Sequence, residues 1–514
     1  MLQSIFQSWS NTVGRILPPV LQSPIYLIAI ALAVFVLTTW ALRMLAKSPI
    51  KPAGSPPQLL MPMGEILRHF SECQFDFIRE GFRATSSSIF QFKLNRHDVI
   101  TLSGDEGRNR FYAEKGLDLY EGYQIFISTV RGFGWAVASY DFNKLTYSGS
   151  NRIGPASSPR HVQALIPSLL SDCERTTAFW GDQGELDPCS AVHDVTFQMI
   201  IRATTSFDVA DNPALVTRLQ HNYDVIDSPF KPFLTKLPWL PGPSVLWKIW
   251  ALGDIYRVFK KTIRDRENSG IFREDALQQM LDAGESEGSV LQLMIGLPIA
   301  GARSTGTIGT WLIIFLSSQP EWAAAVREEI QTLINTHNFT SSPRSKQVLI
   351  QALSSIPLSA WESQLPRLDF CIRETLRTSQ PLTAVRKNMG PDFSIGPYTI
   401  PRGSFIAYPV ADTSLTPAYY PDPTRWDPAR GVNKDAPFLG WGGGRHACQG
   451  QRLATLTMKL VAAYTLMRFD LAMVDEQGKR MQSPPSPDWN DVSTCHPREK
   501  CRIACVERLV NNTV

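Results

Sequence analysis

The chain has 514 residues, of which 43% are hydrophobic and 19% are charged, and its formal net charge is +4. A chain of this length can bury a large core, and this composition excludes intrinsic disorder, a collagen-like chain and a coiled coil. Because the net charge is small for the length and no long basic run occurs, we expect no nucleic-acid partner.

An uncharged apolar run occupies residues 25–42, with the sequence IYLIAIALAVFVLTTWAL. Eighteen helical residues span roughly 27 Å, close to the thickness of a hydrocarbon core, so the run predicts one membrane-spanning helix. Arg43, Lys47 and Lys51 follow the run and Arg15 alone precedes it, which places the following chain in the cytosol by the positive-inside rule. A cleaved signal peptide is the competing interpretation, but no basic leader lies directly before the run.

We therefore expect four parts: a lumenal segment at 1–24, a transmembrane anchor at 25–42, a proline-rich hinge at 43–57 and a single domain at 58–514. The prolines of the hinge favour a stiff spacer. No repeat or low-complexity stretch divides the domain, and helical patterns dominate from about residue 156 onward. The predicted fold is mainly α.

Several helix boundaries can be predicted from capping residues. Ser158 and Pro159 read as an N-cap and a first helical residue, and Gly181 can close the helix that they open. Further helices are expected to begin near Pro320 and Trp361.

Strand patterns are fewer. Alternation of apolar and polar residues predicts a strand within 93–103, and residues 392–410 predict two short strands around a turn at Pro401, Arg402 and Gly403. The β-sheet region is therefore expected to be small.

The most apolar long stretch after the anchor runs from Val290 to Ser318 and contains Pro298 and several glycines. A second transmembrane span is the alternative, but Arg303 lies at its centre, where a charge would be costly in lipid. We expect a buried core helix, loosened where a ligand approaches its backbone.

Residues 438–450, FLGWGGGRHACQG, surround Cys448 with glycines. Glycine tolerates positive φ and close approach, so this stretch predicts a tight loop that brings amide groups near the sulfur. The helical run that begins at Gln451 places the cysteine at a helix N-terminus, where the macrodipole lowers a thiol pKa. From these residues alone, a catalytic nucleophile or a structural turn remains open.

The stretch resembles the haem-binding signature of the cytochrome P450 family, Phe-x-x-Gly-x-Arg-x-Cys-x-Gly. Trp441 stands for the Phe, Gly444 and Gly450 match, and His446 stands at the Arg position, as in members similar to sterol 14-demethylases. The resemblance implies the mainly helical fold of that family, with haem b as the cofactor and the Cys448 thiolate as its axial metal ligand.

Glu374 and Arg377, three residues apart in LDFCIRETLRTSQP, can pair on one helix, and alone they would indicate a solvated surface pair. They match the Glu-x-x-Arg motif of the family. WDPARG at 426–431 resembles the motif of the third partner, which implies Arg430 in a structural triad, with Arg425 as the alternative. The triad would share one carboxylate between two guanidinium groups and hold the cysteine loop in register.

Arg386, in LTAVRKN, resembles the basic residue that binds a haem propionate, and His446 is the second candidate. The familiar Trp-x-x-x-Arg of an earlier helix is absent. Arg152, in SGSNRIGP, is the substitute, with a surface arginine as the alternative interpretation.

AGARST at 300–305 resembles the oxygen-activating motif Ala/Gly-Gly-x-Asp/Glu-Thr-Thr/Ser. The resemblance implies that Gly301 widens the helix groove for dioxygen and that Ser304 supplies the hydroxyl, with Thr305 as a neighbour able to substitute. Arg303 replaces the acid, much as sterol 14-demethylases place a basic histidine there, and this bears on proton delivery.

The implied function is a fungal-type microsomal haem-thiolate monooxygenase that oxidises an apolar terpenoid, steroid or polyketide intermediate of specialised metabolism. NADPH would supply electrons through a cytochrome P450 reductase, with cytochrome b5 as a further candidate partner. The implied location is the endoplasmic reticulum membrane, single-pass, with the catalytic domain cytosolic. The alternatives are a reductase-independent isomerase or dehydratase, and a haem-binding membrane protein without turnover.

Overall fold

The computed structural model describes residues 54–94, 97–128, 158–228, 243–337, 345–432, 436–492 and 494–509. The chain divides into two compact units, Met1–Ser55 and Pro56–Val514, and every element named below belongs to the second. The apolar run at 25–42, most of the predicted hinge, and Arg152 lie outside the described residues, so the anchor stays a prediction.

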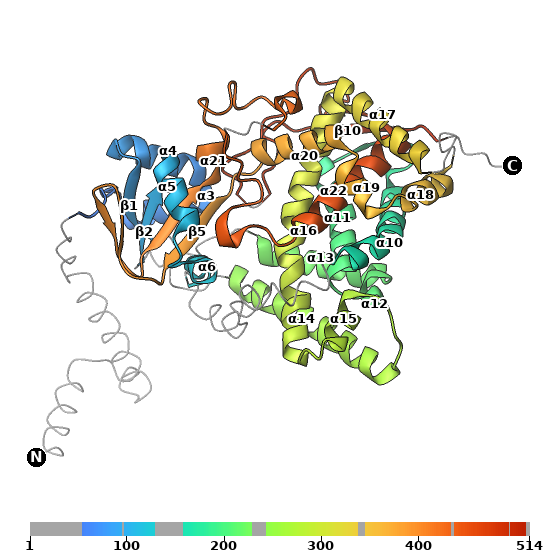
Figure 1. The fold of residues 1–514 in the computed structure, drawn as a ribbon, viewed down its shortest axis with the longest axis horizontal. Helices are drawn as coiled ribbons and strands as arrows, with labels where there is room; N and C mark the ends of the chain where they lie inside the picture. The colour runs from blue at the N-terminus through green and yellow to red at the C-terminus, as the bar shows by residue number, and fades with distance from the viewer. Residues whose placement is uncertain are drawn as a thin grey trace, which may run out of the picture. The chain divides into compact units, whose positions relative to one another are not determined.

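Helices make up most of the second unit, and Figure 1 shows most of those from α10 onward gathered on one side, with the larger sheet and α3 to α6 on the other. The described helices up to residue 378 are α3 (Met63–Glu72), α4 (Gln74–Thr85), α5 (Gly104–Ala113), α6 (Leu119–Ser128), α10 (Pro159–Thr177), α11 (Pro188–Thr204), α12 (Phe207–Ala210), α13 (Pro213–Asp227), α14 (Pro243–Ser269), α15 (Ala276–Asp282), α16 (Glu287–Ser318), α17 (Pro320–Thr336), α18 (Lys346–Ser354), α19 (Leu358–Ser363) and α20 (Pro366–Thr378). The short α21 (Val410–Ser414) and the long α22 (Gln451–Arg468) follow.

Local capping explains where these helices begin. Ser158 accepts a hydrogen bond from the backbone N–H of His161 (3.3 Å), and a single 3₁₀ turn after α10 ends at Gly181, whose φ is 74°. These ends and the start of α17 at Pro320 confirm the predictions. The prediction near Trp361 was imprecise, because this residue lies inside the short α19 and α20 begins at Pro366.

The larger sheet has five strands in the order β1-β2-β8-β5-β3, of which only β2 and β8 run parallel. Its strands are β1 (Ile89–Leu94), β2 (His97–Leu102), β3 (Leu117–Asp118), β5 (Thr383–Asn388) and β8 (Phe405–Pro409). There are two smaller sheets in the described residues. One contains β4 (Gln183–Leu186), β10 (Arg502–Glu507) and β9 (Phe469–Val474), in that order, and the other pairs β6 (Phe393–Ile395) with β7 (Tyr398–Ile400).

The strand predicted within 93–103 is confirmed by β2. It is the second strand of an antiparallel hairpin, in which β1 and β2 pair from Leu94 with His97 to Ile89 with Leu102. The two strands predicted within 392–410 are three, and the predicted turn before β8 is confirmed by Gly403, whose φ is 85°. The strands that were not predicted depend on pairing with a neighbouring strand, which the pattern of one strand does not reveal.

The apolar segment from Val290 to Ser318 lies within α16, which runs unbroken through Pro298. It is the one helix in the described part of the chain that is long and apolar enough to cross a membrane, yet 67% of its most apolar 18-residue stretch is buried inside the protein. Its second half joins the largest apolar cluster, together with α10, α11, α17, α20 and α22. The prediction of a buried core helix is confirmed.

Candidate active site

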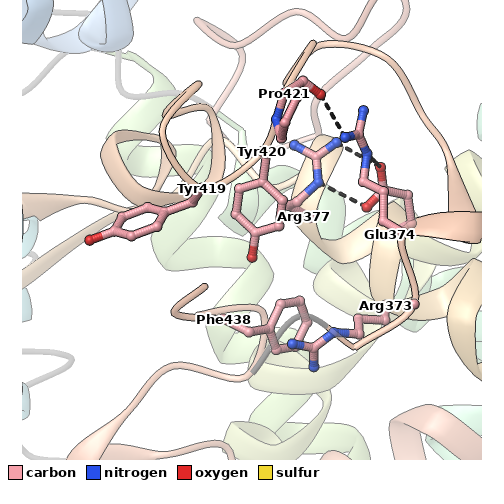
Figure 2. Close-up of a pocket in the computed structure, with 9 residues that line it drawn as sticks. Arg373, Glu374, Arg377, Tyr419, Tyr420, Pro421 and Phe438 are labelled. Atoms are coloured by element: carbon pink, nitrogen blue, oxygen red, sulfur yellow. Dashed lines mark hydrogen bonds and ion pairs between the residues drawn. The ribbon is translucent and has the colours of Figure 1, made fainter. Parts of the chain in front are cut away.

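The buried carboxylate of Glu374 lies between two arginines. Arg377, on the same helix α20, donates from Nε to Glu374 Oε2 (2.8 Å) and from Nη2 to Oε1 (2.7 Å), as Figure 2 shows. Arg430 Nε lies 3.3 Å from the same Oε1. The structure therefore brings together the three predicted triad residues, in the two-pronged geometry that charge-assisted pairs favour.

The other donors of Arg377 and Arg430 bind backbone carbonyl oxygens at 2.6 to 3.1 Å. These oxygens belong to Ser414, Pro421, Asp422, Pro423 and Arg425. The side chain of Arg425 is exposed and lies 3.8 Å from Asp427, so Arg430 and not Arg425 contacts Glu374. The triad thus fixes the irregular chain that runs from α21 toward the cysteine loop.

Helix α20 and the residues directly after it also hold the segment that leads to the cysteine. The guanidinium of Arg373 lies 3.8 Å from the ring centroid of Phe438, a contact visible in Figure 2, and Gln380 donates to the carbonyl of Gly440 (3.3 Å). A Cβ at Gly440 would lie 2.4 Å from Phe438 Cζ and 2.9 Å from Leu376 Cβ. Glycine is required here because the backbone approaches both side chains too closely for any other residue.

Two glycines give the cysteine loop its shape. Gly442 and Gly444 have φ values of 70° and 60°, in the left-handed region that favours glycine. A Cβ at Gly444 would also lie 2.1 Å from the carbonyl oxygen of Tyr112. The loop closes where the backbone N–H of Cys448 donates to the carbonyl of Trp441 (2.9 Å). The tight loop predicted from the glycines is confirmed.

Cys448 lies two residues before Gly450, the N-cap of α22, and is exposed. The placement near a helix N-terminus is confirmed, but the expected fall in the thiol pKa is not. Desolvation by the surrounding atoms raises the pKa of Cys448, and it outweighs the hydrogen bond from the Gly450 backbone, which acts in the opposite direction.

A group of basic side chains lies beside this loop. Arg386 on β5 is buried, donates to the carbonyl of Val385 (2.9 Å), and has no carboxylate ion pair with any described residue. Burial lowers the pKa of its guanidinium. Arg445 and His446 both reach the carbonyl of Leu117, at 3.0 and 3.3 Å, and burial together with nearby Arg386 lowers the pKa of His446.

Tyr112, on α5, adds an unsatisfied hydroxyl next to these groups. Its side chain packs against the loop at Gly443, and its buried oxygen has no hydrogen-bond partner among the described residues. Burial raises the pKa of Tyr112 to about 12, although the positive charge of Arg386 acts against this. A buried donor beside a buried, unpaired cation calls for an anionic acceptor.

On α16, Ser304 is exposed and its Oγ donates to the carbonyl of Ala300 (3.0 Å). Thr305 is buried on another face, so it is not an equivalent substitute for Ser304. A Cβ at Gly301 would lie 3.6 Å from Ile200 Cγ2 on α11. This places the Cβ position of Gly301 toward α11, and the predicted groove role of Gly301 stays a prediction.

Arg303 is engaged rather than free. Its Nη2 lies 2.8 Å from Asp224 Oδ1, and its Nε lies 3.4 Å from Asp227 Oδ2. Both aspartates belong to α13. The position at which the family motif has an acid therefore carries a cation, and acids from another helix meet it.

A mainly helical fold, a cysteine in a glycine loop and a Glu–Arg–Arg triad together define a haem-thiolate protein. The cytochrome P450 model matches residues 162–489, and the chain belongs to the cytochrome P450 family.

Known proteins agree with this assignment. The chain is 26% identical over 412 residues to the cytochrome P450 monooxygenase AacuE of Aspergillus aculeatus, covering 76% of this chain and 80% of that protein. It is 25% identical over 430 residues to the sterol 14-demethylase of Arabidopsis thaliana, covering 78% and 81%. The fold is similar to that of the retinoic acid bound cyanobacterial CYP120A1, with a TM-score of 0.66 over 88% of this chain and 100% of that one at 20% identity. The enzyme class is that of a cytochrome P450 monooxygenase.

The residues present fit the haem that the family implies. Cys448 is exposed in a loop of fixed shape and would be the axial ligand. Arg386, which is buried and forms no ion pair with a carboxylate of the described residues, would bind a propionate together with His446 and the Tyr112 hydroxyl. Trp441, Gly444 and Gly450 would support the ligand through the loop backbone.

Sequence reasoning missed Tyr112 and the two aspartates of α13. Asp224 and Asp227 carried a signal of their own, because two acids in the last turn of a helix oppose its dipole. Tyr112 carried no local signal, since its role depends on the approach of a segment more than three hundred residues away.

Proposed function

We propose that this enzyme inserts oxygen from O2 into an apolar small molecule, with electrons from NADPH delivered by a cytochrome P450 reductase and assisted by cytochrome b5. The proposed substrate is a terpenoid, steroid or polyketide intermediate of specialised metabolism, supported by the likeness to P450 monooxygenases of Aspergillus and other fungi. The observation that carries the oxygenase proposal is the exposed hydroxyl of Ser304 on α16, the helix that contains the stretch similar to the oxygen-activating motif.

Each residue has a distinct task in this proposal. Bound haem supplies the oxygen-activating chemistry, and a cysteine thiolate ligand increases its electron density. Glu374, Arg377 and Arg430 keep the loop of Cys448 in place. Ser304 holds a proton at Oγ, which becomes available for donation when its bond to the carbonyl of Ala300 is released.

The test is metabolite comparison in cells that express the chain with a reductase, followed by NADPH consumption with the purified pair. Ser304→Ala should reduce the coupling, which is the amount of product formed per NADPH oxidised, by about 10- to 100-fold. Ser318→Ala is the matched control, because its hydroxyl also bonds the carbonyl four residues earlier on the same helix. Equal coupling in the wild type and Ser304→Ala would contradict the role of this hydroxyl.

A second candidate is a reductase-independent isomerase or dehydratase, favoured by Arg303 at the position of the acid. Product formation without NADPH and reductase would establish it and overturn the oxygenase proposal. Haem binding without product under either condition would instead indicate a protein without turnover.

We also propose that the chain is anchored in the endoplasmic reticulum membrane by residues 25–42, with its catalytic domain cytosolic. Support comes from the apolar run and from the exposed Trp247 and Trp250 at the start of α14, since tryptophan is favoured at membrane interfaces. Deleting residues 25–42 should release the protein from sedimented membranes. Any remaining vesicle binding should fall in Trp247→Ser/Trp250→Ser and not in Phe179→Ser, which changes another exposed aromatic residue.

A further inference from the structure

One side chain of α16 joins two carboxylates of α13. Asp224 and Asp227 are three residues apart and therefore share a face of their helix. Arg303 meets both, with Nη2 2.8 Å from Asp224 and Nε 3.4 Å from Asp227. Since Arg303 directly precedes Ser304, this contact ties the end of α13 to the segment that carries the exposed hydroxyl.

The end of α13 is unfavourable by its own sequence. Its last turn holds two acids and no basic residue, although the C-terminus of a helix favours cations and like charges three residues apart repel. Such a conflict between local preference and fold is stable only when other elements compensate for it. The compensation must come from neighbouring helices.

Two cations and one histidine provide it. Lys248 of α14 donates to the carbonyls of Ile226 and Ser228, which satisfies backbone groups at the helix end. His193 of α11 lies with its Nε2 3.4 Å from the Asp224 oxygen that Arg303 also meets. Of these three groups, only Arg303 comes from α16, so it alone links the acids of α13 to the segment that carries Ser304.

Burial raises the pKa of Asp227, and the positive charges of Arg303 and Lys248 act against that rise. Arg303 therefore favours the ionised form of Asp227. The guanidinium of Arg303 presents hydrogen-bond donors and no acceptor, so it cannot accept a hydrogen bond as the acid of the family motif would.

We propose that Arg303, Asp224 and Asp227 form a latch that holds the C-terminal end of α13 over the part of α16 that carries Ser304. Arg303 is then a positioning residue. The latch goes beyond the proposed function, on which it rests only for its effect on turnover, because its direct consequence is the mobility of α13.

The test uses the full haem-loaded chain and needs neither substrate nor reductase. Hydrogen exchange of residues 213–227 and the association rate of 4-phenylimidazole, a nitrogen ligand of haem iron, should both increase about tenfold in Arg303→Gln, the size expected for a lost charge-assisted bond. The double variant Asp224→Asn/Asp227→Asn should behave alike. Arg367→Gln is the matched control, because Arg367 of α20 pairs at 2.8 Å with Glu328 of α17 and so also joins two helices; it should change neither quantity.

A charge exchange separates the latch from a general loss of packing. Arg303→Asp should exchange faster than the wild type, and adding Asp224→Arg should bring the protection of α13 back toward the wild-type value. Unchanged exchange in both Arg303→Gln and the double Asn variant, or no recovery on charge exchange, would overturn the proposal. Because both measurements are made without turnover, absence of oxygenase activity in the wild type would refute the proposed function and leave the latch standing.

Discussion

At the scale of single residues, Glu374 is a buried carboxylate that pairs with two arginines. Its carboxylate neutralises Arg377 and faces Arg430, and the first two side chains are almost completely buried. Removing this charge leaves a guanidinium buried without its counterion, which costs far more than losing a surface pair.

Glu374→Gln should therefore lower the free energy of unfolding by roughly 3–5 kcal/mol and reduce haem content in the purified protein. Denaturant unfolding and the haem-to-protein absorbance ratio measure the two effects. Glu362→Gln serves as the control, since its pair with Arg452 is 42% exposed on both sides and should contribute at most about 1 kcal/mol. Similar losses in the two variants would mean that the triad has no special structural role.

Tyr112 offers a cleaner test of the haem site, because its buried hydroxyl has no partner among the described residues. Tyr112→Phe should leave the unfolding free energy of the haem-free protein unchanged or slightly higher, since it removes an unsatisfied polar group. Haem loss to apomyoglobin should become roughly three- to tenfold faster, as expected for one lost hydrogen bond to an anion.

Tyr408→Phe is the contrasting variant, because the Tyr408 hydroxyl lies 2.7 Å from Thr413 Oγ1. It should destabilise the haem-free protein without affecting haem loss. An unaltered rate of haem loss in Tyr112→Phe would show that this hydroxyl does not serve the cofactor.

At the scale of elements, the cysteine loop depends on backbone conformation and on close approach together. Gly444 has a positive φ, and a Cβ there would meet the carbonyl of Tyr112 at 2.1 Å. Gly403 also has a positive φ, but nothing lies within 4 Å of its Cβ position. Substitutions at these two glycines therefore separate the free-energy cost of backbone strain from that of a steric clash.

Gly403→Ala should cost about 1 kcal/mol, the strain of a non-glycine residue in the left-handed region. Gly444→Ala should cost the same strain plus the displacement of Tyr112, and it should abolish the red-shifted absorption band of the reduced, carbon-monoxide-bound protein. Comparing thermal unfolding with this spectrum distinguishes the effects. A normal spectrum in Gly444→Ala would show that the loop tolerates rearrangement.

Elements with strong local signals were predictable. The helix after Ser158 and Pro159, and the helix that starts at Pro320, begin where capping chemistry places them. The hairpin of β1 and β2 was not predicted, because its first strand and the register come from pairing between strands.

At the scale of the whole molecule, the buried His161 links the stability of the fold to pH. His161 of α10 is 6% exposed and contacts Gln279 of α15, and desolvation lowers its pKa below the ordinary value. The folded state then binds fewer protons than the unfolded state between the two pKa values. Stability from this group is present above about pH 6.5 and is lost as the pH falls through the folded pKa.

His161→Gln should reduce the fall in melting temperature between about pH 7 and about pH 5, because it removes this proton uptake on unfolding. Thermal unfolding at several pH values measures it. Gln331→Ala on α17 is the comparison, because neither Gln331 nor Asn335, to which it donates a hydrogen bond, takes up a proton; it should keep the wild-type slope. Parallel curves for the wild type and His161→Gln would contradict the linkage.

The sequence alone determined the features that depend on neighbours in the chain. These are the glycine loop around Cys448, the Glu374 and Arg377 pair, the buried character of α16 and the family resemblance that the comparisons confirmed. Each follows from residue spacing, capping or composition within one segment, so the physics that produces it is local.

Only the tertiary structure decided which distant groups meet. It selected Arg430 over Arg425 at Glu374, set Tyr112 and Arg386 beside the cysteine loop, and paired Arg303 with acids of α13. In each case the energy comes from burying or pairing a polar group against an element far away in sequence. No local pattern encodes that choice, because it exists only once the chain has packed.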